Sequence, residues 1–322
     1  MPRKICVLGE GAWGTAIATL LTDNGHEVNM WCHDIDVAHS IKISRSNKYV
    51  PNLKISSKII PFTHIKDALE EVDYIFEAIP VKFLREVVVQ SKPFFKDNHV
   101  WVILSKGIES DTLMLPSQIL DDVFGIYVKK AVISGPSFAK DLISKDLTAV
   151  DLACGDEAVQ KKIIEILSNN YFKIFSCKDL MSVQFCGALK NVVSIIVGMA
   201  DGFGYDDNCK AYLAVLGLKE ISGIIQEFRG DKNIVYGLAG VGDLILSSFG
   251  KSGRNFLIGK EIGQGNKLDN ILSEAKIMPE GINTIKSVYQ IIKKYDLNLP
   301  LFSNIYKVIF EQLSCEQFFR LI

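Results

Sequence analysis

The segment between Ile5 and Asp34 places the strongest constraint on the fold of this chain. Residues 5–8 form a short apolar run that leads directly into a G-x-G-x-x-G pattern at residues 9–14. Apolar residues at helical spacing follow, and a second apolar run begins after Asn24-Gly25. A strand, a glycine turn, a helix and a strand within about 30 residues are typical of a dinucleotide-binding βαβ unit.

Each glycine of the turn has a mechanical role in such a unit. Gly9 allows the tight turn, Gly11 lets the backbone approach a pyrophosphate, and Gly14 lets the helix pack closely on the strand. Asp34 stands 20 positions after the last glycine (34 − 14), where an acid favours a free ribose 2′-hydroxyl, as in NAD. A protonated His33 can instead meet the 2′-phosphate of NADP. The expected cofactor is therefore NAD or NADP, and these residues leave the choice open.

Alternation of strands and helices continues to about residue 178 and then stops. Strands are expected at residues 5–8, 27–31, 59–62, 74–79, 101–105, 131–134, 148–153 and 172–175. Helices are expected in the last part at residues 181–200 and 208–228, after 254, from 280, and at 301–313. The first pattern predicts a mostly parallel, doubly wound sheet. We therefore expect an α/β Rossmann-like NAD(P)-binding domain over residues 1–178 and an all-α domain, which holds the other candidate site residues, over 179–322.

Composition argues against several other classes of protein. The chain has 322 residues and a net charge of −1, which disfavours nucleic acid as a partner. It contains no run of about 18 apolar residues and no signal-peptide pattern at its start, so we expect a cytoplasmic protein without a membrane span. Its seven cysteines are dispersed without a C-x-x-C pair, which predicts free thiols and no metal site. All five histidines lie at or before His99, so a catalytic group in the last two-thirds is not a histidine.

Residues 187–197 form an apolar stretch that contains Lys190 and Asn191. The pKa of a lysine that loses water tends to fall, which suits a proton donor and acceptor near neutral pH. The alternative is a helix whose Lys190 extends to solvent along one polar edge. The stretch by itself does not decide between them.

Four further segments hold residues suited to a phosphorylated ligand or to catalysis. Lys106 follows a predicted strand and can reach a phosphate or a substrate oxygen, or else it is an exposed loop lysine. Asp243 follows a glycine-rich turn at a helix start, where it is a catalytic acid, an N-cap, or both. Residues 250–255 (GKSGRN) form either a phosphate site or a solvated basic loop. Residues 279–281 form either part of a site or a helix-opening turn.

Taken together, these motifs resemble those of the bacterial type of NAD(P)-dependent glycerol-3-phosphate dehydrogenase. The segments that carry the resemblance are 9–14, 24–28 (NGHEV), 47–51 (NKYVP), 105–109 (SKGIE), 134–139 (SGPSFA), 187–191 (GALKN), 240–244 (GVGDL), 254–255 (RN) and 280–281 (EG). The resemblance implies an oxidoreductase that transfers hydride reversibly between the nicotinamide and C2 of dihydroxyacetone phosphate. The product is sn-glycerol 3-phosphate, a precursor for phospholipid biosynthesis. It also implies a homodimer.

The resemblance assigns a role to each matching residue. Lys190 is implied to be the proton donor and acceptor for the C2 oxygen, with Lys106 and Asp243 as further catalytic residues. The implied substrate-binding residues are Lys106, Gly135, Ser137, Lys190, Asp243, Gly253, Arg254 and Asn255, with Arg254 on the phosphate. The implied cofactor-binding residues are Gly9, Gly11, Ala12, Trp13, Gly14, His33, Lys106, Ala139, Arg254, Met278 and Glu280.

The sequence departs from the family pattern at several of these positions. Glu10 lies inside the glycine turn, close to the expected cofactor phosphates. His33 stands where the family often has arginine, which puts a strong NADP preference in doubt. Ser105 and Ser247 replace frequent threonines and keep the hydroxyl group, whereas Gly253 replaces a serine and leaves only its backbone.

Three other functions compete with this interpretation. Dehydrogenases of the lactate or malate type require a catalytic histidine that this chain lacks beyond His99. A 6-phosphogluconate or hydroxyisobutyrate type of dehydrogenase also uses a lysine and is the nearest alternative, but Arg254-Asn255 favours the glycerol phosphate enzyme. A non-catalytic dinucleotide sensor would not need Lys106, Lys190 and Asp243 together.

Overall fold

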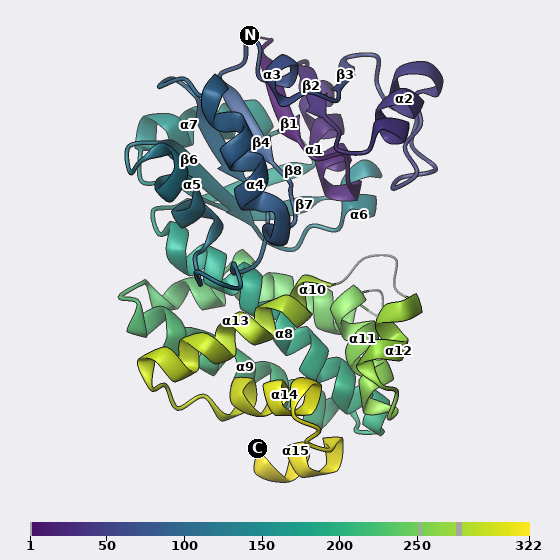
Figure 1. Cartoon of the computed structure of the whole chain (residues 1–322), viewed down its shortest axis with the longest axis vertical. Coiled ribbons are helices and arrows are strands. Elements are labelled where there is room, and N and C mark those ends of the chain that lie inside the picture. Colours follow the sequence, from purple (N-terminus) through teal and green to yellow (C-terminus); the bar gives the residue numbers. More distant parts are fainter. Residues whose placement is uncertain (1, 251–252, 275–278) are drawn as a thin grey trace. The chain divides into compact units, whose positions relative to one another are not determined.

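The computed structural model describes residues 2–250, 253–274 and 279–322 (Figure 1). Contacts between Cα atoms divide the chain into two compact units. The sheet unit comprises Met1–Ser105 and Pro116–Leu180, and the helical unit comprises Lys106–Leu115 and Met181–Ile322. The chain therefore enters the helical unit twice. The domain boundary near residue 178 remains a prediction. In the structure the second stretch of the sheet unit ends at Leu180, and residues 106–115 belong to the helical unit.

The sheet unit is built on an eight-stranded sheet in the described residues, with strand order β3-β2-β1-β4-β5-β6-β7-β8. Its strands are β1 (Lys4–Leu8), β2 (Glu27–Trp31), β3 (Ile59–Phe62), β4 (Tyr74–Glu77), β5 (Val100–Ile103), β6 (Lys129–Ser134), β7 (Thr148–Ala153) and β8 (Phe172–Cys177). Neighbouring strands of this described sheet are parallel, except that β7 runs antiparallel to β6. The order reverses at β1, and such a switch point is where open α/β sheets bind ligands.

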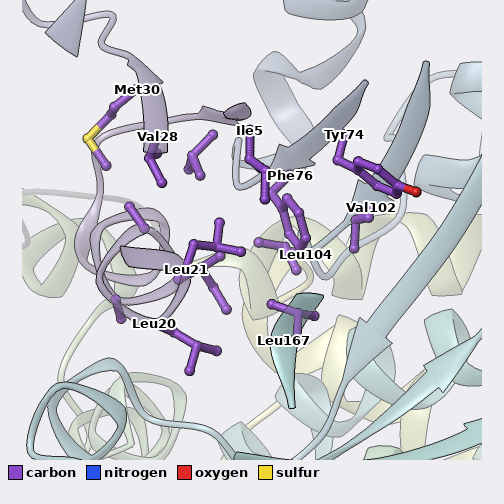
Figure 2. Packing of buried hydrophobic residues seen from close by; sticks show 14 of the residues in the cluster. Ile5, Leu20, Leu21, Val28, Met30, Tyr74, Phe76, Val102, Leu104 and Leu167 are labelled. Carbon is purple, nitrogen blue, oxygen red and sulfur yellow. The ribbon is translucent and has the colours of Figure 1, made fainter. Parts of the chain in front are cut away.

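Helices cover the sheet because each presents an apolar face to it. They are α1 (Ala12–Asp23), α2 (Ile35–Ser44), α3 (Ile65–Ala68), α4 (Val81–Ser91), α5 (Pro116–Phe124), α6 (Ala139–Ile143) and α7 (Glu157–Leu167), with a 3₁₀ turn at Lys92–Phe94. Leu20 and Leu21 of α1 lie in one buried cluster with Ile5, Val28 and Phe76 of the strands (Figure 2). Burial of each such side chain stabilises the fold by about 1.5–3 kcal/mol.

The helical unit is organised around α8 (Leu180–Phe203), whose residues 182–200 are all buried. The others are α9 (Asp207–Glu227), a 3₁₀ turn (Lys232–Tyr236), a π-helical turn (Leu238–Gly242), α10 (Asp243–Phe249), α11 (Arg254–Gly263), α12 (Leu268–Glu274), α13 (Glu280–Tyr295), α14 (Pro300–Phe310) and α15 (Cys315–Leu321). Among the described residues, α8 is long and apolar enough to cross a membrane, with a mean hydropathy of 1.6. However, 89% of its apolar window is buried by protein, as in the core helix of a globular unit.

Helices α8 and α11 pack through glycines. A Cβ atom on Gly198 of α8 would lie 2.0 Å from the carbonyl oxygen of Phe256, and one on Gly202 would lie 2.0 Å from that of Lys260. Conversely, a Cβ on Gly259 of α11 would lie 1.9 Å from the carbonyl oxygen of Ile195. No side chain fits at these distances, so the two backbones are in direct contact.

The structure confirms the expected fold, a Rossmann-like sheet followed by helices. All eight expected strands are present in the described residues, and their ends differ from the expectation by at most two residues. Several short helices were not predicted, among them α2, α3 and α6. Their apolar faces are only one or two turns long, so a 3.6-residue period is hard to recognise in them.

Candidate active site

The glycine turn of the sheet unit has the geometry that its sequence predicts. Gly9 has φ of +110°, which L side chains rarely adopt, and a Cβ there would lie 2.8 Å from the carbonyl oxygen of Ala78. A Cβ on Gly14 would lie 2.1 Å from the carbonyl oxygen of Gly9, so Gly14 permits the close packing of α1. Ala12 and Trp13 form the first residues of α1 and pack against the core.

Gly11 differs from the other two glycines of the turn. Its φ of −58° and ψ of 173° suit other residues, and a Cβ there would have nothing within 4 Å. Neither its conformation nor its neighbours therefore require glycine. As the residue before α1, Gly11 adjoins free N–H groups at a helix N-terminus, where a phosphate binds favourably. These residues fit a dinucleotide whose pyrophosphate occupies the open space.

The end of β2 is held by a buried carboxylate. Glu10 is 8% exposed, and its two oxygens accept the backbone N–H groups of His33 (3.1 Å) and Asp34 (3.0 Å). Glu10 thus binds the segment after β2, a role that the sequence did not suggest. The side chain of Asp34 caps α2 by accepting the N–H groups of Asp36 and Val37, and it pairs with Lys48 at 2.5 Å. The Lys48 ammonium holds the pKa of Asp34 below its usual value.

The segment after β6 carries the predicted residues Gly135, Ser137 and Ala139. A Cβ on Gly135 would lie 2.9 Å from Cα of Val150 in β7, so glycine allows the chain to pass this strand. The Ser137 hydroxyl donates to the carbonyl oxygen of Gly135 at 2.9 Å. Ala139 begins α6 and packs on the core of the sheet unit.

A second buried acid, Glu77, was missed by the sequence reasoning. It ends β4, is 0% exposed, accepts the N–H of Ile79 at 2.6 Å, and accepts the Ser105 hydroxyl at 2.8 Å. Ser105 directly precedes Lys106 in the chain, so this bond fixes the point at which the chain leaves the sheet unit. It also explains why a hydroxyl side chain is kept at position 105. An acid at the end of an otherwise apolar strand is the signal that could have revealed it.

In the helical unit, Asp243 binds two lysines. Its Oδ1 lies 3.0 Å from Nζ of Lys190, and its Oδ2 lies 2.5 Å from Nζ of Lys106. Lys190 is 7% exposed and Asp243 is 2% exposed, so the first pair is buried. This excludes the alternative in which Lys190 extends to solvent, and it also places Lys106 in an ion pair instead of an open loop.

Asp243 is the first residue of α10, and the N-cap position is occupied by Gly242 without a side-chain cap. The N-cap role is therefore wrong, and the carboxylate serves the lysines instead. A π-helical turn directly precedes α10, and such turns occur frequently at functional sites. Ser194, one turn after Lys190 on α8, donates to the carbonyl oxygen of Ser247, one turn after Asp243 on α10. Two contacts spaced by one helical turn thus set the register between α8 and α10.

Burial and neighbouring charges shift both titrating groups of the buried pair. Burial lowers the pKa of Lys190, and the cations of Lys106 and Arg254 lower it further, whereas Asp243 opposes them. Burial would raise the pKa of Asp243, but Lys106 and Lys190 together hold it below its usual value. The cluster therefore combines an ionised carboxylate with an ammonium that releases its proton more readily than an ordinary lysine.

The N-terminus of α11 lies beside this cluster within the helical unit. Nδ2 of Asn255 donates to Oδ1 of Asn191 at 3.0 Å, which supplies the partner of Asn191 that the sequence could not show. Oδ1 of Asn255 is buried and has no hydrogen-bond partner among the described residues. Arg254, the first residue of α11, is exposed. A Cβ on Gly253 would lie 2.2 Å from the carbonyl oxygen of Ser247, which explains why a side chain is absent there.

The last predicted residues lie around the start of α13. Glu280 is the first residue of this helix, and Pro279 is its N-cap. A Cβ on Gly281 would lie 2.5 Å from Oδ1 of Asn255, so α13 packs directly on the substrate-binding candidates. Met278 lies outside the described residues.

The structure therefore places the predicted residues in two sets, one in each unit. Gly9, Gly11, Ala12, Trp13, Gly14, His33, Gly135, Ser137 and Ala139 belong to the sheet unit. Lys106, Lys190, Asp243, Gly253, Arg254, Asn255 and Glu280 belong to the helical unit. A dinucleotide turn at a sheet switch point, joined in one chain to a buried lysine–aspartate cluster, defines a nicotinamide-dependent dehydrogenase.

Comparisons with known proteins identify the family. Residues 4–160 match the family described as NAD-dependent glycerol-3-phosphate dehydrogenase N-terminus, and residues 179–320 match the corresponding C-terminus. The glycerol-3-phosphate dehydrogenase [NAD(P)+] of Bacillus subtilis is 38% identical over 317 residues, which cover 98% of this chain and 92% of the relative. The enzyme of the same name from Staphylococcus aureus strain JH9 is 34% identical, with coverage of 98% and 96%.

A solved structure agrees with these matches. The crystal structure of glycerol-3-phosphate dehydrogenase from Coxiella burnetii superimposes with a TM-score of 0.95 at 28% identity, covering 99% of this chain and 98% of that one. The chain belongs to the NAD(P)-dependent glycerol-3-phosphate dehydrogenase family.

Proposed function

We propose that this chain catalyses the reversible, NAD(P)H-dependent reduction of dihydroxyacetone phosphate to sn-glycerol 3-phosphate. The observation that carries the proposal is the buried contact between Lys190 and Asp243, with Lys106 on the second carboxylate oxygen. Reduction of a ketone requires a hydride, a proton and a fixed substrate. The reduced nicotinamide, when bound, supplies the hydride to C2.

Lys190 is the proton donor in this proposal. Its ammonium transfers a proton to the C2 oxygen during reduction and its neutral amine takes the proton back during oxidation. The lowered pKa of Lys190 favours this exchange, because a proton is more easily lost from a desolvated ammonium. General acid catalysis of this kind contributes about 10²–10⁴-fold to the rate.

Asp243 and Lys106 have supporting roles in the same step. Asp243 keeps Lys190 in one position and favours its charged form, since a buried ammonium without a partner would lose its proton too early. Lys106 shares the carboxylate, and its positive charge is suited to polarise the substrate carbonyl. Either lysine alone would leave one carboxylate oxygen without its ion pair.

Arg254 and Asn255 anchor the substrate in this proposal. An exposed guanidinium at a helix N-terminus combines two features that bind a phosphate, a planar cation and free backbone N–H groups. The unpartnered Oδ1 of Asn255 supports a hydrogen bond from a substrate hydroxyl. Because the phosphate is remote from C2, its binding energy can orient the carbonyl.

We further propose a dinucleotide site at the glycine turn, where the open space at Gly11 supports an approaching pyrophosphate. Gly9, Ala12, Trp13, Gly14, His33 and Ala139 of the sheet unit, with Lys106, Arg254 and Glu280 of the helical unit, complete the proposed contacts. Gly135, Ser137 and Gly253 are proposed to contact the substrate. The enzyme would act in the cytoplasm as a homodimer and supply glycerol 3-phosphate for phospholipid biosynthesis.

A steady-state assay tests the reaction. The purified chain should oxidise NADH or NADPH when dihydroxyacetone phosphate is added, and it should reduce NAD or NADP with sn-glycerol 3-phosphate. 6-Phosphogluconate and 3-hydroxyisobutyrate serve as comparison substrates, and turnover of either one in preference to glycerol 3-phosphate would contradict the proposal. Dinucleotide binding without any turnover would favour the sensor function instead.

A further inference from the structure

We propose that Glu10 selects the dinucleotide that lacks a 2′-phosphate, so that this chain uses NADH in preference to NADPH. The inference rests on the proposed function, because it names the cofactor of that reaction. Glu10 belongs to the glycine turn but is not among the residues expected to bind the cofactor or the substrate. The choice between the two dinucleotides was open at the level of the sequence.

The carboxylate of Glu10 occupies the position of an anion at the end of β2. Its Oε2 accepts the N–H of His33 and its Oε1 accepts the N–H of Asp34. Two successive backbone N–H groups that converge on one acidic group form an anion-binding arrangement. In a Rossmann-type unit the side chain that binds the ribose 2′-hydroxyl, or that accommodates a 2′-phosphate, belongs to this region of the chain. A free backbone N–H group here would also be available to a 2′-phosphate. The protein supplies its own anion to both N–H groups.

Glu10 is held firmly in this position. Its side chain is only 8% exposed, and its carbonyl oxygen accepts hydrogen bonds from Thr15 (3.1 Å) and Asn47 (2.8 Å). Backbone and side chain are thus both bound to neighbouring elements of the sheet unit. The backbone contacts fix the Cα of Glu10, and the two N–H groups of residues 33 and 34 hold its carboxylate.

Asp34 adds a second negative charge at the same place. One of its oxygens is engaged in capping α2, and the other pairs with Lys48. The cation that a 2′-phosphate would attract is therefore already paired with a carboxylate. A doubly charged phosphate would have to approach two carboxylates and would find the nearby backbone donors occupied. A ribose hydroxyl carries no charge and avoids this repulsion.

The basic side chains that favour a phosphate line a pocket of about 390 Å³, and His33 is one of them. His64 and Lys66 also line this pocket, so three basic side chains are present. Each lies on an exposed or partly exposed surface, where water screens its attraction for a phosphate. Glu10 is buried and its charge is screened less, which favours exclusion of the 2′-phosphate.

The test compares the binding of NADH and NADPH without substrate, followed by turnover with dihydroxyacetone phosphate. The dissociation constants, from calorimetry of the purified chain, should favour NADH by about tenfold or more, and kcat/KM should follow the same order. Glu10→Gln removes the charge and retains one acceptor, whereas Glu10→Ala frees both N–H groups. Each variant should reduce the preference for NADH by about tenfold. Glu70→Gln, an exposed acid of the same unit, is the matched control and should leave the preference unchanged.

Two results would overturn the inference. Tighter binding of NADPH by the unmodified chain would show that His33, His64 and Lys66 prevail. An unchanged NADH-to-NADPH ratio in Glu10→Gln would show that Glu10 has no part in selection, even if Glu10→Ala fails to fold. Failure of the proposed function is distinguishable from both, since it appears as absence of dihydroxyacetone phosphate turnover with either dinucleotide while the binding ratio remains measurable.

Discussion

Lys190 and Asp243 are 53 residues apart in the chain and form a buried ion pair, with 3.0 Å between Nζ and Oδ1. Removal of one partner from such a pair leaves an uncompensated charge in the interior, at a cost of about 3–5 kcal/mol. A buried pair of this kind seldom adds net stability over a hydrophobic replacement. Its presence in the core of the helical unit therefore supports the proposed catalytic role of the pair.

Replacement of Lys190 tests the proton donor. We expect Lys190→Met to lower kcat for dihydroxyacetone phosphate by about 10²–10⁴-fold while NADH still binds. Steady-state kinetics and calorimetry measure the two effects separately. Lys219→Met removes an exposed lysine of α9 and should have no effect. Turnover close to that of the unmodified chain would remove Lys190 from the mechanism.

The pH dependence of reduction reports on the same pair. Lys190 must carry a proton to donate it, so kcat for reduction should decline as pH rises through its lowered pKa. In Asp243→Asn the carboxylate no longer favours the ammonium, so the pKa of Lys190 should fall and the alkaline decline should begin at lower pH. Glu227→Gln removes the charge of an exposed acid on α9 and serves as the control, so it should leave the pH dependence of kcat unchanged. A decline displaced towards higher pH would contradict the assigned role of Asp243.

Arg254 should affect substrate binding more than chemistry. A guanidinium–phosphate contact contributes about 1.5–3 kcal/mol, so Arg254→Ala should raise KM for dihydroxyacetone phosphate by roughly 10–100-fold. Dihydroxyacetone, which lacks the phosphate, provides a control within each protein. Because Arg254 is also a proposed cofactor contact, its slow turnover is measured at saturating NADH, and this turnover should fall much less in the variant than the turnover of dihydroxyacetone phosphate. If both substrates lose activity equally, Arg254 does not bind the phosphate.

The contact between α8 and α11 should be intolerant of a single methyl group. A Cβ on Gly259 would lie 1.9 Å from a backbone oxygen, so Gly259→Ala should lower the free energy of unfolding by roughly 1–3 kcal/mol. Gly223→Ala on α9 is the matched control, because its Cβ would meet only a Leu299 methyl at 3.5 Å. That variant should be about 0.5–1 kcal/mol more stable, since glycine weakens a helix interior. Denaturant unfolding measures both, and equal stabilities would contradict the close contact.

Glu220 should make stability depend on pH. Its buried carboxylate accepts the N–H groups of Leu301 (2.7 Å) and Phe302 (2.9 Å) at the start of α14, and burial raises its pKa from 4.5 to about 7. The folded state therefore holds this proton more tightly than the unfolded state, so the group costs stability as pH rises from about 4.5 to 7. The loss should be on the order of 1–3 kcal/mol relative to Glu220→Gln. The free energy of unfolding of both proteins is measured at pH 5, 6, 7 and 8. A difference between the two proteins that does not change with pH would contradict the prediction.

The sheet unit could be predicted closely because its signals are local. The turn at residues 9–14 and the eight apolar strand segments each occupy a few consecutive positions. Their alternation with helices predicts the mostly parallel direction of the strands, but it predicts neither the strand order nor the antiparallel pairing of β7 with β6. Lys190 could be identified as a candidate because an ammonium in an apolar run is costly. Asp243 was a candidate too, because it follows a glycine-rich turn at a helix start, but its pairing with Lys190 could not be predicted, since the packing of α8 on α10 brings the two together.

Other features depend on contacts that no local pattern encodes. The sequence shows glycines at residues 198, 202, 259 and 263, but only the structure reveals that they lie in one helix–helix contact. Glu10 was expected beside the cofactor phosphates because the turn is a phosphate-binding element. The structure instead directs its carboxylate to the N–H groups of His33 and Asp34, which become available only after β2 pairs with β1.

The double entry of the chain into the helical unit limits how its parts can be exchanged. Residues 106–115 are anchored there by the Ser287 hydroxyl, which donates to the carbonyl oxygen of Ile108 at 3.1 Å. A gene fusion cut at residue 180 would transfer Lys190 and Asp243 but leave Lys106 behind with the sheet. The recipient would inherit an aspartate with one ammonium in place of two. Recombination between relatives must therefore exchange residues 106–115 together with residues 181–322. The helical unit is compact, but it cannot be transferred as one continuous segment of the gene.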